Sequence, residues 1–138
     1  DGTSETVAID WGLTGFGRVG EEAGQMTAAA LFWLKVPADQ ARELEEVVFA
    51  GYLDGLRDAG WRGDNKLVRL GFTVNAFLLF GITMNLFHLQ AMKQPAKVSE
   101  METNMGQPVD AIILQWAEIS PFLLNLGEEA CTLIQELS

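Results

Sequence analysis

The residue types best suited to chemistry gather near the start of the chain. Asp10 ends a short apolar stretch and is followed by a glycine-rich loop that contains Gly15, Gly17 and Gly20. A carboxylate at the exit of a buried strand is rigidly held and partly desolvated, which suits it to binding a divalent cation. A glycine-rich loop before a helix is a common setting for phosphate. These residues therefore predict a site for a metal ion and a phosphate.

The same segment resembles the metal-binding segment of the aminoglycoside phosphotransferase-like kinases. Their pattern is of the type (V/I)-I-D-W-x-x-x-G-x-G-x-x-x-x-D-L-A, and it is matched without a gap by Ile9-Asp10-Trp11, Gly15, Gly17 and Glu22. The resemblance implies the helical C-lobe of a protein-kinase-like fold. It also implies transfer of the γ-phosphoryl group of ATP to a hydroxyl of a small molecule.

The resemblance implies roles for the acidic residues of this segment. Asp10 would bind the Mg²⁺ that bridges the ATP phosphates, so it is the expected catalytic, cofactor-binding and metal-binding residue. Glu22 stands where the family usually has an aspartate that tethers the catalytic loop, and Glu21 competes for that role. The family's general-base Asp and its Asn metal ligand would lie before residue 1. We therefore expect a C-lobe fragment that is inactive alone, with its N-terminal lobe missing or replaced by another chain.

Two other interpretations of the segment stay open. Gly15-Phe-Gly17-Arg-Val-Gly20 spells the dinucleotide fingerprint G-x-G-x-x-G. A Rossmann unit needs its first glycine directly after the strand and a second strand after the helix, whereas here four residues separate Asp10 from Gly15 and more helix follows. A strand, turn and helix that bind no ligand are the remaining possibility.

Composition and charge limit the class of protein. The chain has 138 residues, of which 49% are hydrophobic, and this is enough for one core of ordinary size. Its net charge of −10 speaks against nucleic acid or an anionic membrane surface as partner, because both would be repelled. The acidity would attract a cationic small molecule, although general solubility explains it as well. The single cysteine, Cys131, is expected in the core, and the reducing cytoplasm is the simplest compartment.

Hydrophobic periodicity and helix breakers predict a mainly α single domain, 1–138. It begins with a short β-strand or hairpin and the metal-binding loop (1–20), followed by a helical subdomain (21–138). The expected helices are 21–36, closed by Pro37; 38–59, ended by Gly60; 64 or 65 to about 92, followed by a break at Pro95; and a last stretch from 109, kinked or split by Pro121.

The run Leu70–Leu89 has no charged residue and is long enough to span a bilayer. Polar residues inside it, among them Asn75 and Asn85, favour a central bundle helix covered on every side by neighbours. We therefore expect soluble core and no membrane span. His88 is the only histidine in the chain, and we expect it to be hydrogen-bonded or on the surface, without a catalytic role.

Candidate acceptor-facing acids are Glu21, Asp54, Asp58 and Asp64, although no motif distinguishes them. The acceptor itself is open: an antibiotic, a sugar, an amino alcohol and a protein side chain all fit. A second hypothesis, of a different class, is a non-catalytic helical interaction module in which Asp10 only turns or caps the chain.

Overall fold

The structure is a computed structural model that describes residues 16–138, so Asp10 and the predicted strand lie outside the described residues. Within that range the chain is helical and contains no strand, which confirms the mainly α class. The elements are α1 (Glu21–Phe32), η2 (Ala38–Gln40), α2 (Ala41–Asp58), α3 (Asn65–Asn75), η3 (Ala76–Met84), α4 (Asn85–Ala91), α5 (Pro95–Met105) and α6 (Val109–Leu137).

The first helix is shorter than predicted, because α1 ends at Phe32 and the chain turns away at Leu34 (φ 56°), before it reaches Pro37. α1 has Glu21 and Glu22 in its first turn, where carboxylates favour the positive end of the helix dipole. η2 and α2 follow Pro37, and together they match the predicted second helix, 38–59. The chain leaves α2 through Gly60, whose φ of 88° is the left-handed conformation that glycine adopts without strain.

α3, η3 and α4 follow one another without interruption from Asn65 to Ala91. Asp64 caps α3, since its Oδ1 accepts a hydrogen bond of 2.8 Å from the backbone N–H of Lys66. The middle segment, η3, is wound more widely than an α-helix. The Asn85 side chain donates to the carbonyl oxygens of Phe80 (2.9 Å) and Gly81 (3.2 Å), and so satisfies backbone groups that the wide turn leaves over.

The C-terminal half holds one more helix than predicted, and of the two outcomes predicted at Pro121, a kink or a split, the split is wrong. The polar segment after Pro95 is a helix, α5, which starts at Pro95 because proline lacks only an N–H that is free in the first turn of a helix. α6 is also not split at Pro121, which lies inside a continuous helix of 29 residues. The stretch that follows Pro121 packs well enough to outweigh the lost hydrogen bond, since Phe122, Leu123 and Leu126 are buried.

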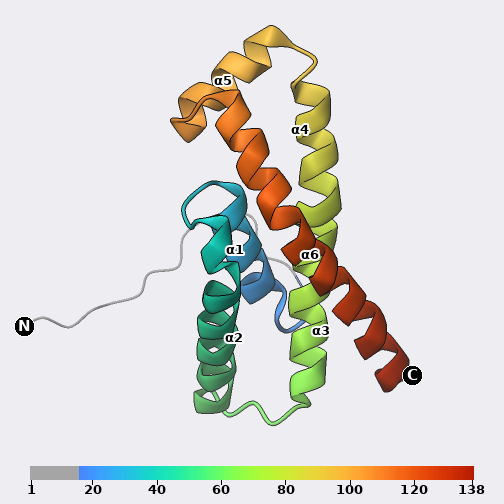
Figure 1. Cartoon of the computed structure of the whole chain (residues 1–138). Coiled ribbons are helices and arrows are strands. Elements are labelled where there is room, and N and C mark those ends of the chain that lie inside the picture. Colours follow the sequence, from blue (N-terminus) through green and yellow to red (C-terminus); the bar gives the residue numbers. More distant parts are fainter. Residues whose placement is uncertain (1–15) are drawn as a thin grey trace, which may run out of the picture.

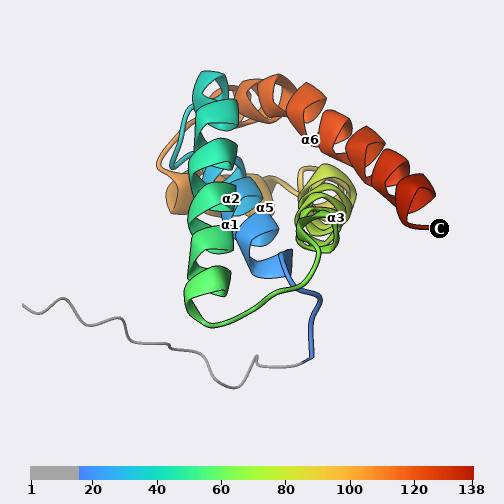
Figure 2. The same ribbon diagram turned by 90° about the horizontal axis from the view of Figure 1, so that it is seen from below.

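Short α1 lies at the centre of the fold and contacts α2, α3, η3 and α6 (Figure 1). Viewed from below, α2 covers one side of α1, α3 lies on the other side, and α6 passes across them (Figure 2). The core is formed where these helices meet. Its largest fully buried side chains include Phe32 of α1, Phe72 of α3 and Ile112, Ile119, Leu123 and Leu126 of α6.

Several burial predictions are wrong. The long helix is not covered on every side, because Leu78, Leu86, Phe87 and Leu89 are more than half exposed. Cys131 is exposed as well, since it lies on the outer face of α6. Helical spacing also predicts Met26 on one inner face with Ala30 and Leu34, but Met26 is 58% exposed.

Candidate functional site

The described part of the predicted site is the junction between the glycine-rich loop and α1. Gly20 is buried there and has a φ of 97°. A Cβ at Gly20 would overlap the carbonyl oxygen of Val68, and a Cβ at Gly71 of α3 would overlap that of Val19. The glycines therefore let the start of α1 approach the backbone of α3 closely, which fixes where the loop enters the fold.

Tyr52 of α2 ties this junction to the next helix. Its hydroxyl accepts a hydrogen bond from the N–H of Gly20 and donates one to Oε2 of Glu22, both at 3.1 Å. Burial raises the pKa of Tyr52, the bond from Gly20 lowers it, and the bond to the Glu22 carboxylate raises it further, so that the net shift is upward. Glu22 thus has a tethering contact, although its partner is a tyrosine of α2.

The other acidic candidates are separate from one another. Glu21 pairs with Arg18 at 3.1 Å, and Asp54 pairs with Arg57 at 2.8 Å on the exposed face of α2. Asp58 is the exposed last residue of α2, and Asp64 is engaged as the cap of α3. Among residues 16–138 no group of three or more His, Cys, Asp or Glu side chains could hold a metal ion. A metal role consequently rests on Asp10, which the structure does not describe.

A partly buried ion network joins three helices, and the sequence does not predict it. Arg69 of α3 donates two hydrogen bonds of 2.6 Å to the carboxylate of Glu129 in α6 and another to Glu45 of α2. Its guanidinium also lies 5.0 Å from the ring centres of both Phe49 and Phe72.

This network is best explained as structural. Burial alone would lower the pKa of Arg69, but the hydrogen bonds to Glu129 and Glu45 outweigh it and raise that pKa. Because Arg69 of α3 pairs with Glu45 of α2 and with Glu129 of α6, the network ties these three helices together. Glu45 is only 5% exposed. The signal that points to it is Arg69 itself, the one charged residue between Leu67 and Ala91.

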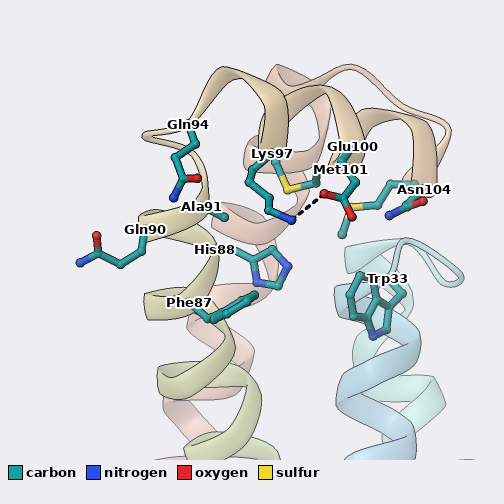
Figure 3. A pocket seen from close by; sticks show the side chains of 11 residues that line it. Trp33, Phe87, His88, Gln90, Ala91, Gln94, Lys97, Glu100, Met101 and Asn104 are labelled. Atoms are coloured by element: carbon teal, nitrogen blue, oxygen red, sulfur yellow. Dashed lines mark hydrogen bonds and ion pairs between the residues drawn. The ribbon is translucent and has the colours of Figure 1, made fainter.

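A cavity of about 450 Å³ lies between the end of α1, α4 and α5 (Figure 3). Trp33, Phe87, His88, Met101 and Met105 give it an aromatic and thioether lining. The sequence predicts that His88 is either hydrogen-bonded or on the surface. It is hydrogen-bonded, since its Nδ1 lies 2.7 Å from the carbonyl oxygen of Met84. With an exposed fraction of 7%, it does not lie on the surface. Figure 3 shows Phe87 and His88 on α4 facing Trp33 across the cavity.

Comparisons with family models, with curated proteins and with solved structures gave no match to this chain. Function is therefore inferred from the residues and their geometry.

Proposed function

We propose that the chain is the C-terminal part of an ATP-dependent phosphotransferase that acts on a hydroxyl of a small molecule. The observation that carries the proposal is the ungapped match of Ile9-Asp10-Trp11, Gly15, Gly17 and Glu22 to the metal-binding segment of the aminoglycoside phosphotransferase-like kinases. A helical body directly after this segment agrees with the C-lobe that the resemblance implies.

The geometry at the start of α1 supports the same proposal. In the resembled kinases an acidic residue at the position of Glu22 tethers the catalytic loop. Here Glu22 and the backbone of Gly20 share Tyr52 as a partner, so the loop end and the helix start are held against α2. A loop anchored in this way would keep the residues before it in a fixed position, as a metal ligand requires.

Asp10 would hold Mg²⁺ through its carboxylate, and the ion would neutralise charge on the ATP phosphates during transfer. Glu21 and Glu22 would not act as metal ligands, because they are paired with Arg18 and Tyr52. The resemblance assigns the general base, the second metal ligand and the nucleotide-gripping lobe to segments upstream of the motif. We therefore propose that the 138 residues alone neither transfer phosphate nor bind ATP tightly.

The test is a phosphoryl-transfer assay on the longest native protein that contains this chain, with sugars, amino alcohols and aminoglycosides as acceptors. ADP release that depends on both an acceptor and Mg²⁺, and that stops with EDTA, supports the proposal. Calorimetric titration of Mg-ATP into the 138-residue chain should show no binding at micromolar concentrations. ADP release that no acceptor in the panel increases would contradict the proposal. Tight binding of ATP or NAD by the 138-residue chain would also contradict it.

One observation favours the alternative of a non-catalytic helical interaction module. Large apolar side chains are exposed along the second half of the long helix and on α6, including Leu78, Leu86, Leu89, Leu114 and Leu124. Large apolar side chains exposed in this number are typical of surfaces that contact another protein or lobe. In the kinase hypothesis the same surface would be covered by the remainder of the enzyme. The phosphoryl-transfer assay separates the two functions, because only the kinase would transfer phosphate to an acceptor.

A further inference from the structure

We propose that the cavity between α1, α4 and α5 binds a flat, uncharged molecule that carries an aromatic ring system and a hydroxyl group. The proposal goes beyond phosphoryl transfer and does not depend on it. A cavity of about 450 Å³ is within the range typical of small-molecule sites. It is also large enough for a two-ring compound.

The lining favours rings over aliphatic chains. Trp33 lies on the α1 side and Phe87 on the α4 side, while Met101 and Met105 of α5 contribute thioethers (Figure 3). Aromatic rings pair favourably with other rings, and methionine sulfur makes favourable contacts with ring edges. A flat aromatic ligand would therefore find suitable partners on each of the three helices.

His88 supplies the polar contact that would orient the ligand. A carbonyl oxygen can only accept, so the short contact of 2.7 Å to Met84 places a proton on Nδ1 of His88. In the neutral ring Nε2 is then an acceptor, and among residues 16–138 it has no hydrogen-bond partner. The ring is held by edge contacts with Phe32, Trp33, Phe87 and Trp116 at centroid distances of 5.0 to 5.9 Å. A preorganised acceptor in an apolar cavity selects a ligand that donates, such as a phenol.

The charges in the lining favour an uncharged ligand. Lys97 and Glu100 both line the cavity, and they pair with each other at 2.7 Å along α5 (Figure 3). Their charges cancel locally, so neither an anion nor a cation gains an unpaired counter-charge. The remaining polar residues, Gln90, Gln94 and Asn104, are neutral amides.

Calorimetric titration of 2-naphthol into the 138-residue chain tests the proposal, and 2-methoxynaphthalene serves as a probe with the same rings but no donor. We expect 2-naphthol to bind 1:1 with a Kd below about 1 mM. We expect 2-methoxynaphthalene to bind about tenfold more weakly, because it cannot donate to Nε2. No binding of 2-naphthol at a concentration of about 1 mM, or equal affinity for the two probes, would overturn the proposal.

Three variants locate the binding. Ala91→Leu adds bulk to the lining and should abolish binding of both probes, whereas Ala50→Leu, on the exposed surface of α2, should leave it unchanged. His88→Phe keeps a ring but removes the acceptor, so it should bind both probes equally. Circular dichroism checks that each variant is folded. Unchanged affinity in Ala91→Leu would overturn the site even if His88→Phe fails to fold.

Discussion

Tyr52 is the side chain that links the glycine-rich loop, α1 and α2. It satisfies the N–H of Gly20 and the carboxylate of Glu22 at once. We predict that Tyr52→Phe lowers the free energy of unfolding by about 1–2 kcal/mol, because both groups lose a partner. Urea denaturation measures this. Glu22→Gln keeps an acceptor oxygen and should cost less, so a larger loss in Glu22→Gln than in Tyr52→Phe would contradict the assignment.

The raised pKa of Tyr52 gives the same contact a pH dependence. A folded-state pKa above the ordinary value of 10.0 means that the folded protein holds the phenol proton more tightly than the unfolded chain. The resulting stabilisation is complete below pH 10 and is lost as pH rises through the folded pKa. Since Tyr52 is the only tyrosine, the absorbance of its phenolate reports the titration directly. A midpoint at or below 10.0 in the folded protein would refute the shift.

Arg69 gives a second prediction at the residue scale. Arg69→Leu removes the hydrogen bonds to Glu129 and one of the two arginine partners of the buried Glu45, which keeps Arg42 at 3.1 Å. We expect a loss of about 1.5–3 kcal/mol in the free energy of unfolding. Arg57→Leu breaks only the exposed pair with Asp54 and should change stability by less than about 1 kcal/mol. Chemical denaturation of the two variants side by side is the measurement, and equal losses would show that the network is not structural.

Among the helices, the contact of α1 with α3 depends on backbone proximity. A Cβ at Gly71 would overlap the backbone carbonyl of Val19, two residues before α1, so Gly71→Ala must push the start of α1 away from α3. We predict a loss of roughly 2 kcal/mol or more, in line with other overpacked sites. Gly51→Ala in α2 is the matched control, since open space surrounds that position. There the change should stabilise the helix by about 0.5–1 kcal/mol. A neutral Gly71→Ala would contradict the close approach.

Helix boundaries with a local cause could be predicted from the sequence. Gly60 and Asp64 act through their own backbone or side-chain chemistry, and they end and start a helix as expected. Pro37 does not close the first helix as predicted, because α1 already ends at Phe32. α5 is not among the predicted helices, because a proline such as Pro95 signals a break as readily as the first turn of a helix. The wide turns of η3 could not be foreseen, because they depend on how the long helix packs against α1 and α6.

The candidate site shows the same division. The loop residues and Glu22 could be selected from a linear pattern, but the partner of Glu22, Tyr52, comes from another helix and has no local signal. The environment of His88 likewise depends on rings from α1 and α6, namely Phe32, Trp33 and Trp116. Tertiary packing therefore decided which predicted residues meet.

At the scale of the whole molecule, the balance between core and exposed apolar surface bears on solubility. Asn65–Ala91 and Val109–Leu137 are both long and apolar enough to cross a membrane, with 33% of each apolar window buried, which is weak evidence for a span. We predict a soluble chain, because Arg69, Glu129 and the acidic surface would be costly in lipid. Fractionation after expression without detergent is the measurement, and recovery only with membranes would contradict the prediction.

The proposed role of Asp10 as the metal ligand of a phosphotransferase is tested most directly by ATP turnover in an Asp10→Asn variant of the longest native protein that contains this chain. Asparagine keeps the shape but removes the charge, so we predict a loss of at least about 100-fold with the fold retained. Asp110→Asn, an exposed acid of α6, is the matched control and should keep wild-type activity. Wild-type turnover in Asp10→Asn would contradict the account.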